Sequence, residues 1–256
     1  MSESKEVKEQ YEKILEATIS SAKAFSTTLK NAISLNNVIP LLFFTNGFEI
    51  KLLDTSEICM MHAVFDRSFI VYKNIVKDMA IFISEEAAKQ LIALANDEPI
   101  TLEVYAKEGD PMRIKVYSSS FETEQELVIG AAILKNPKVN LFNSFITTKK
   151  ELNNVLKVGS KYDNLEISNV GGKVALTIMN DNEHYTYYPK VESSEITDVS
   201  AKVKVDKGKL KQILKYMKPS ERLTIKYGNY ESPILVEAIL PGTIFTDFYL
   251  APIIEE

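Results

Sequence analysis

Residues 87–117 read AAKQLIALANDEPITLEVYAKEGDPMRIKVY, and residues 208–240 read GKLKQILKYMKPSERLTIKYGNYESPILVEAIL. Each stretch predicts a helix, a polar break, a strand, a Gly-containing turn and a second strand, in the same order. Gln90 and Gln212 are 122 positions apart, and so are Pro111 and Pro233. The second half of the chain therefore repeats the first.

Two further matches support the repeat. Leu29-Lys30-Asn31 corresponds to Leu152-Asn153-Asn154 at an offset of 123, and the turn at Asn46-Gly47 corresponds to Gly171-Gly172 at an offset of 125. The offset is that of one whole domain and far exceeds the length of a short structural repeat. Two copies of one domain make a pseudo-symmetric block, which is suited to closed rings.

The bulk composition is that of an ordinary globular protein. The chain has 256 residues, 45% hydrophobic and 25% charged, which is enough for two domains with cores of their own. It has no apolar run of the roughly 20 residues that a membrane span requires, and its first residues are too charged for a signal peptide. The single cysteine, Cys59, excludes an internal disulfide and suggests a reducing compartment. The net charge of −5 argues against a simple nucleic-acid binder.

The pattern along the chain predicts two helices and several strands in each half. Residues 3–17 favour a short amphipathic helix or a frayed tail outside the repeat, and residues 119–138 favour one strand followed by a connector. The expected helices span 22–34, 84–96, 148–159 and 206–217. The expected strands span 38–44, 48–53, 57–65, 100–106, 112–118, 165–168, 173–180, 185–189, 223–226, 234–240 and 244–250.

Positive charge concentrates on the expected helices. Counting the last helix to Lys218, the four helices carry a net charge of +7, so the rest of the chain carries −12. If the helices share one face, that face is a basic surface on an acidic protein, and it would attract a polyanion without reading its sequence. The alternative is that lysines fill the solvent side of any surface helix. The helix at 84–96 carries no net positive charge, so the basic charge lies mainly in the second half.

The sequence contains no motif that predicts catalysis or metal binding. Cys59 and His62 lie three positions apart in an expected strand, so their side chains point to opposite faces and cannot share a metal ion. The nine glycines form no phosphate-binding loop. Acidic pairs such as Glu85-Glu86 occur at helix starts, where the helix dipole accounts for them. We therefore expect neither an enzyme nor a cofactor.

Four features resemble the sliding clamps of the proliferating-cell-nuclear-antigen (PCNA) type. They are the segment NGFEIKLLDTSEICMMHAVF at 46–65, the strand SPILVEAIL at 232–240, the C-terminal FYLAPIIEE at 248–256, and the two-domain arrangement itself. The resemblance implies an α+β DNA-clamp fold, with two helices packed on antiparallel sheet in each domain and six domains in a ring. The implied divisions are an extension at 1–17, domain 1 at 18–126, a connector at 127–138 and domain 2 at 139–256.

The resemblance also implies a function. Family members encircle double-stranded DNA without sequence preference and act as processivity factors in DNA replication and repair. The helices line the hole, so the residues expected to face DNA are Lys23, Lys30, Lys89, Lys149, Lys150, Lys157, Lys207, Lys211, Lys215 and Lys218. Implied partners are a DNA polymerase, a flap endonuclease, a DNA ligase and a clamp loader, each bound through a short peptide motif, together with the other subunits of a homotrimer or heterotrimer. No membrane is involved, and the location would be cytoplasmic for an archaeal-type protein or nuclear for a eukaryotic one.

Two protein-binding sites follow from the same resemblance. The partner peptide would bind an outer groove made by Leu53, Ile58, Ile133, Leu134, Pro233, Tyr249, Leu250, Ala251 and Pro252. The C-terminal Ala-Pro would offer backbone carbonyls for strand-like pairing with the peptide. Subunits would meet through edge strands at 112–118 and 173–180, using Met112, Ile114, Val116, Val174, Leu176 and Ile178.

Two other hypotheses remain open. The chain could be a clamp-fold regulatory or scaffold subunit of a heteromeric ring, which binds partners without itself retaining DNA. Poor retention of DNA with normal partner binding would favour that hypothesis. It could also be an unrelated two-domain enzyme with an unrecognised carboxylate site, which would make the repeat, the C-terminal segment and the charge distribution coincidental.

Overall fold

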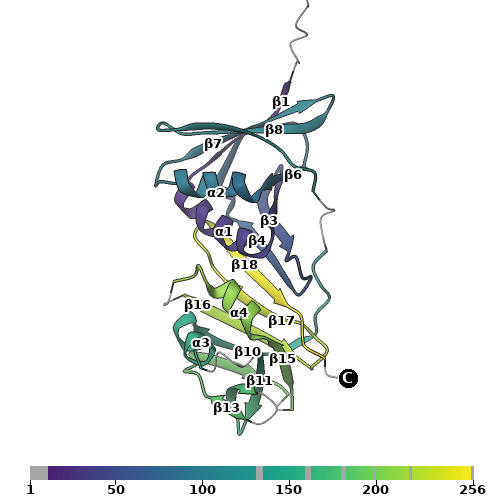
Figure 1. Ribbon diagram of the computed structural model, residues 1–256, viewed down its shortest axis with the longest axis vertical. Helices are drawn as coiled ribbons and strands as arrows, with labels where there is room; N and C mark the ends of the chain where they lie inside the picture. Colours follow the sequence, from purple (N-terminus) through teal and green to yellow (C-terminus); the bar gives the residue numbers. More distant parts are fainter. Residues whose placement is uncertain are drawn as a thin grey trace, which may run out of the picture.

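The computed structural model describes residues 11–130, 135–158, 163–179, 183–198, 200–218 and 221–254 (Figure 1). The first half contains β1 (Glu12–Ile19), α1 (Ala22–Leu35), β2 (Val38–Phe44), β3 (Gly47–Leu53), β4 (Cys59–Phe65), a 3-10 turn (Arg67–Phe69), β5 (Ile70–Ile75), β6 (Met79–Ser84), α2 (Glu85–Leu94), β7 (Ile100–Lys107), β8 (Asp110–Tyr117) and β9 (Glu122–Glu126). The second half contains β10 (Leu141–Thr148), α3 (Lys149–Leu156), β11 (Asn164–Val170), β12 (Lys173–Met179), β13 (His184–Tyr187), β14 (Ser193–Ile196), β15 (Lys202–Asp206), α4 (Lys207–Leu214), β16 (Arg222–Gly228), β17 (Ile234–Ala238) and β18 (Thr243–Leu250).

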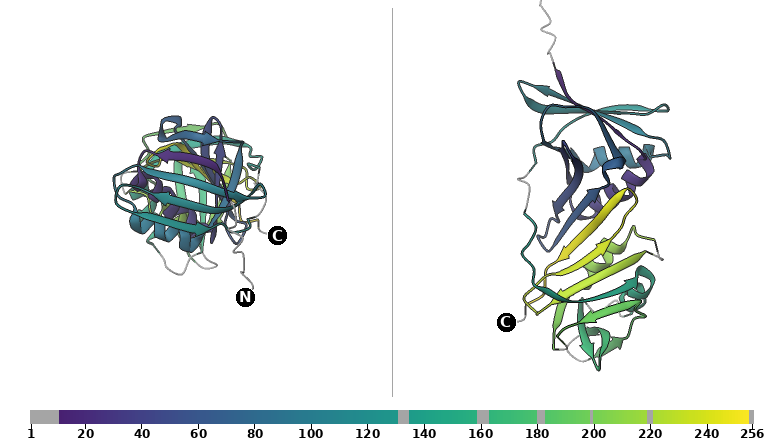
Figure 2. Two further views of the ribbon diagram at one scale, coloured as in Figure 1. Left: turned by 90° about the horizontal axis from the view of Figure 1, so that it is seen from above. Right: turned by 180° about the vertical axis from the view of Figure 1, so that it is seen from behind.

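The strand order confirms the duplication. The first half has the sheets β5-β1-β7-β8-β9 and β6-β2-β3-β4, and the second half has β14-β10-β16-β17-β18 and β15-β11-β12-β13. The two sets correspond strand for strand. One extra pairing, between β18 and β4, joins a sheet of each half into a continuous nine-stranded sheet. Seen from behind, this sheet runs past the boundary between the halves (Figure 2).

The four helices begin at capping residues that the sequence supplies. Ser21, Ser84, Thr148 and Asp206 each accept a hydrogen bond from the backbone N–H three residues later. The helices follow one another in the order α2, α1, α4, α3 on one side of the molecule (Figure 1). The expected α+β architecture, with two helices and antiparallel sheet in each half, is therefore confirmed.

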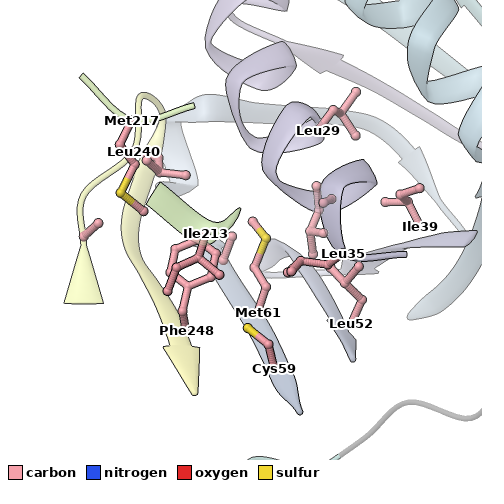
Figure 3. Close-up of a cluster of buried hydrophobic side chains, with 14 of the residues drawn as sticks. Leu29, Leu35, Ile39, Leu52, Cys59, Met61, Ile213, Met217, Leu240 and Phe248 are labelled. Carbon is pink, nitrogen blue, oxygen red and sulfur yellow. The ribbon is translucent and has the colours of Figure 1, made fainter. Parts of the chain in front are cut away.

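The hydrophobic core is continuous through the boundary between the halves. Leu29 and Leu35 of α1 and Met61 of β4 come from the first half, while Ile213 of α4 and Phe248 of β18 come from the second (Figure 3). All five are buried. Since each fully buried side chain of this size contributes roughly 1.5–3 kcal/mol, the junction stabilises both halves as one unit.

The expectation for the N-terminal segment was wrong over its described part. Residues 12–17 form no helix and are not outside the first domain, because β1 lies between β5 and β7. Leu15, Ala17 and Ile19 point into the core, and the charges point outward, where Lys13 pairs with Glu16 at 2.5 Å and with Glu103 at 3.1 Å. Ion pairing within β1 and across to β7 thus lets a highly charged segment form a central strand. Residues 1–10 lie outside the described part of the chain.

Several strands were not predicted. They are β1, β5, β6, β10, β14 and β15, while the strand expected within 119–138 is β9. Strands β10 and β15 end directly at the capping residues of α3 and α4, Thr148 and Asp206, so strand and helix signals run together there. No described helix has the length and apolar character to cross a membrane.

Candidate functional site

The row of helices presents most of the expected lysines to solvent. Lys23, Lys89, Lys150, Lys157, Lys211, Lys215 and Lys218 are exposed, and Lys30 and Lys149 are partly buried. Two of the exposed lysines are paired with acids on the same surface: Lys23 lies 3.2 Å from Asp97, and Lys89 lies 2.5 Å from Glu85. No ion pair links the other exposed lysines of this set to a described residue. The uncompensated positive charge is therefore concentrated on α3 and α4.

Two expected lysines have other roles. Lys207 is buried, 7% exposed, and its Nζ donates a hydrogen bond to the Val158 carbonyl at 3.1 Å. Burial lowers its pKa. Lys207 does not face solvent, because the first turn of α4 packs this side chain beneath the end of α3. The Lys149 Nζ donates to the carbonyls of Lys215 and Met217, which satisfies backbone acceptors at the end of α4.

An ion pair joins the helix row to the first half. Lys209 of α4 binds the carboxylate of Asp54, which lies just after β3 and has no exposed side-chain area. Lys209 also donates to the Ser56 hydroxyl at 2.8 Å. Burial alone would raise the pKa of Asp54, but the backbone N–H groups of Cys59 and Ile58 and the Lys209 ammonium lower it overall. Lys209 therefore contributes to the joint between the halves and adds no free charge to the surface.

A small apolar cluster lies on the opposite face of the nine-stranded sheet, away from the helices. Met60, Leu235 and Tyr249 form its buried part, and Leu53, Val139 and Leu141 pack against them. We call these six residues the outer cluster. They come together because Leu235 pairs with Tyr249, and Tyr249 pairs with Met60, which pairs with Leu53. The cluster thus bridges β17, β18, β4 and β3 at the junction of the halves.

Only part of the expected groove belongs to this cluster. Leu53 and Tyr249 are members. Leu250 is not, because alternation along β18 turns it into the main core, where it has no exposed area. Ile58 also packs against the main core. Pro233, Ala251 and Pro252 are partly buried, and Ile133 and Leu134 lie outside the described residues.

Met60, Leu235, Val139 and Leu141 were missed. Alternation of side chains along β4 and β17 could have identified the first two, because Met60 and Leu235 are each paired with Tyr249 and face the same side of the sheet as Tyr249. Val139 and Leu141 could not have been found this way, because the expected connector ended at residue 138 and β10 was not predicted.

The backbone N–H groups of the C-terminal segment, at Ala251 and Ile253, donate hydrogen bonds to carbonyls elsewhere in the same chain. The Ala251 N–H donates to the Ile58 carbonyl, and the Ile253 N–H donates to the Lys204 carbonyl, both at 2.8 Å. Pro252 forms a bridge with Val205. The segment is thereby held beside the outer cluster.

The connector contacts the outer face at three places. The Val128 N–H donates to the Phe82 carbonyl at 3.0 Å, and Gly130 lies so close to the Phe82 ring that a Cβ would meet it at 1.9 Å. Asn136 donates to Nδ1 of His62 at 3.4 Å, which leaves the Nε2–H of His62 to donate to Glu49 at 2.8 Å. The described parts of the connector therefore contact β6 at residues 128–130 and β4 at Asn136, and Val139, just after the connector, belongs to the outer cluster.

The expected subunit interface was wrong. Strand β8 is paired with β7 and β9, and β12 is paired with β11 and β13, so neither strand has a free edge. Ile114, Val116, Val174, Leu176 and Ile178 are buried in the chain's own core, and only Met112 is exposed. The outermost strands at these ends are β9 and β13. The error arose because strand order cannot be read from the sequence spacing of the strands alone.

The described residues show no metal centre. Among them, no group of three or more His, Cys, Asp or Glu side chains is placed to hold a metal ion. Cys59 is a free, buried thiol whose pKa burial raises to about 12, so it is not a reactive nucleophile at neutral pH.

Comparison with known proteins identifies the fold. No family model and no curated protein matches the sequence. Solved structures do match. PCNA of A. fulgidus, bound to the C-terminal region of FEN-1, has a TM-score of 0.78 and 15% identity, covering 94% of this chain and 99% of its own. PCNA of Thermococcus kodakaraensis has a TM-score of 0.77 and 15% identity, covering 93% and 100%. A PCNA2–PCNA3 complex from Sulfolobus tokodaii gives 0.73 and 19%, covering 93% and 98%. The fold is that of the PCNA sliding clamps.

Proposed function

We propose that this protein is a DNA sliding clamp, a scaffold without catalytic activity that forms a ring and tethers DNA-processing enzymes. The observation that carries the proposal is the internal junction between β18 and β4. Its counterparts are β9 in the first half and β13 in the second, and the chain's own sheets leave both strands at an outer edge. Repeating the internal junction between copies of the chain joins them head to tail, and three copies with six domains would close the ring.

The charge distribution supports a role for the helix row as the DNA-facing surface. Exposed lysines of α3 and α4 stand on a protein of net charge −5, so DNA would be held inside the ring and repelled elsewhere. Contacts from lysine to phosphate carry no sequence information and are weakened by salt. Such weak contacts suit a ring that slides, because topology supplies the retention.

The outer cluster is the proposed binding site for partners. The FEN-1 C-terminal region is bound to the A. fulgidus protein, which has the same fold. A peptide with a short helix and aromatic anchors would cover Leu53 and extend the apolar contacts of Met60 and Tyr249. A polymerase, a flap endonuclease, a ligase and a clamp loader would compete for this site, in the cytoplasm of an archaeal cell or the nucleus of a eukaryotic one.

A second candidate function is that of one subunit in a ring of different chains. Two observations favour it: the lysines Lys23 and Lys89 of the first half are paired with acids, and a similar structure is a complex of two distinct PCNA chains. Such a subunit would bind partners and contribute little to holding DNA.

The topological claim can be tested on end-blocked DNA. The protein is threaded onto linear duplex, both ends are then blocked with bound streptavidin, and the salt is raised. A ring stays on blocked DNA and leaves open DNA. Equal loss from both substrates would contradict encirclement by this chain alone, and the second candidate is tested by repeating the assay with companion subunits.

A further inference from the structure

The two halves of the chain repeat each other, so the junction between them predicts which residues would meet where two subunits join. In the internal junction, Leu235 of β17 pairs with Tyr249 of β18, Tyr249 with Met60 of β4, and Met60 with Leu53 of β3. These four residues form one rung across the boundary between the halves. An equivalent rung should cross the boundary between two copies of the chain.

The β9 member of that rung follows from the aligned prolines. Leu235 lies two positions after Pro233, and Arg113 lies two positions after Pro111, its counterpart in the repeat. Arg113 pairs with Glu126 of β9, as Leu235 pairs with Tyr249 of β18. Glu126 is therefore the counterpart of Tyr249.

The β13 member follows from the aligned turns. Strand β3 starts at Gly47 after a two-residue turn, and β12 starts at Lys173 after a turn of the same length. The strand pairing therefore aligns Gly47 with Lys173, one position beyond the match with Gly172 that the sequence suggested. Leu53 lies six positions after Gly47, and Met179 lies six positions after Lys173. Met179 pairs with His184 of β13, as Leu53 pairs with Met60 of β4, so His184 is the counterpart of Met60.

We propose that Glu126 of one copy lies directly opposite His184 of the next, in antiparallel pairing of β9 with β13. This inference rests on the proposed ring and specifies its register and its chemistry. Both side chains are exposed in the single chain, where Tyr249 and Met60 are buried. The next rung places Glu124, the counterpart of Asp247, opposite Thr186, the counterpart of His62.

The charges on β9 are suited to this partner. Lys115 lies 3.0 Å from Glu122, and Arg113 lies 3.4 Å from Glu124, so two of the three β9 glutamates are compensated within the chain. Within the described residues, no ion pair involves Glu126. A carboxylate opposite an imidazole is a favourable cross-strand pair, whereas a second carboxylate there would be repelled. The subunit junction is thus polar where the junction inside the chain is apolar.

Cysteine cross-linking tests the register. Glu126→Cys and His184→Cys are combined in one chain and treated with a short bis-maleimide, while Cys59 is fully buried and stays unreactive. The expected product is a ladder of covalent dimers and trimers on a denaturing gel. A matched variant carries Glu195→Cys in place of Glu126→Cys. Glu195 is an exposed glutamate on the outer strand β14, and this variant should remain monomeric on the gel.

Charge reversal tests the chemistry. His184→Glu should dissociate the assembly, raising its dissociation constant at least tenfold, and adding Glu126→Lys should restore it, while Glu195→Lys should change nothing. Solution mass is measured on every variant. A trimer of the wild-type chain without 126–184 cross-links, or without rescue by the double exchange, would overturn the register and leave the proposed function intact. A wild-type chain that is monomeric would overturn both.

Discussion

Lys209 and Asp54 form an ion pair across the boundary between the two halves, and the Asp54 carboxylate is fully buried. Asp54 also accepts hydrogen bonds from the N–H groups of Ile58 and Cys59, at 2.7 Å and 2.9 Å. The pair joins the turn after β3 to the first turn of α4. It therefore couples the position of α4 to the strand pairing that joins the halves.

Replacing Lys209 with Met should destabilise the protein by roughly 3 kcal/mol, because a buried carboxylate loses its counter-charge. Chemical denaturation of the variant measures this change. Lys202→Met, at an exposed lysine of β15, is the matched control and should shift stability by less than about 0.5 kcal/mol. An equally small effect at Lys209 would show that the ion pair adds nothing to the joint.

Acid should weaken the ion pair between Asp54 and Lys209. The pKa of Asp54 is lowered in the folded protein, so its stabilising contribution is complete above the unfolded value of about 4 and is lost as the pH falls through the folded pKa. The free energy of unfolding of the wild type should fall more steeply below about pH 4 than that of Asp54→Asn. Denaturation curves across that range provide the comparison, and parallel pH profiles would contradict the role given to Asp54.

Lys211 and Lys215 are exposed on α4 and are expected to contact DNA phosphates. The double exchange to Glu should lower DNA affinity and reduce the slope of log affinity against log salt by about 2 for each subunit that contacts the duplex, since each phosphate contact contributes roughly one unit. Fluorescence anisotropy with a labelled duplex gives both quantities. Lys77→Glu, at an exposed lysine in the turn between β5 and β6, should leave the slope unchanged. An unchanged slope in the Lys211 and Lys215 variant would show that α4 does not contact the DNA phosphates.

Leu53 is one of three partly exposed members of the outer cluster, with Val139 and Leu141. Leu53→Asp should weaken binding of a peptide with a one-turn helix and aromatic anchors by at least tenfold, since a charge would face the anchors' apolar contacts. DNA affinity and solution mass should stay at wild-type values. Ile239→Asp, at an apolar residue 68% exposed outside the cluster, is the control. If both variants bind the peptide alike, the site lies elsewhere.

The sequence predicted the repeat because turn and helix-end residues recur at offsets of 122 to 125 positions, and the strand order confirms it. It did not predict β1, because the charges of Lys13 and Glu16 obscure an alternation that cross-strand pairing makes possible. Lys207 was expected to face DNA because it lies on a helix that the resemblance implies lines the hole, but its position in the first turn of α4 buries it. The interface strands were misplaced because edge position is a property of the assembled sheet. Leu53 and Tyr249, which were expected in the groove, belong to the outer cluster, whereas their neighbours Met60 and Leu235 were not expected there.

The solution mass of the purified chain tests the central claim most directly. Light scattering coupled to size exclusion at moderate salt should give three times the chain mass of 28.9 kDa, or about 87 kDa, as the proposed pairing of the outer strands β9 and β13 between identical copies predicts. A mass near 29 kDa at micromolar concentration would contradict a ring built from this chain alone.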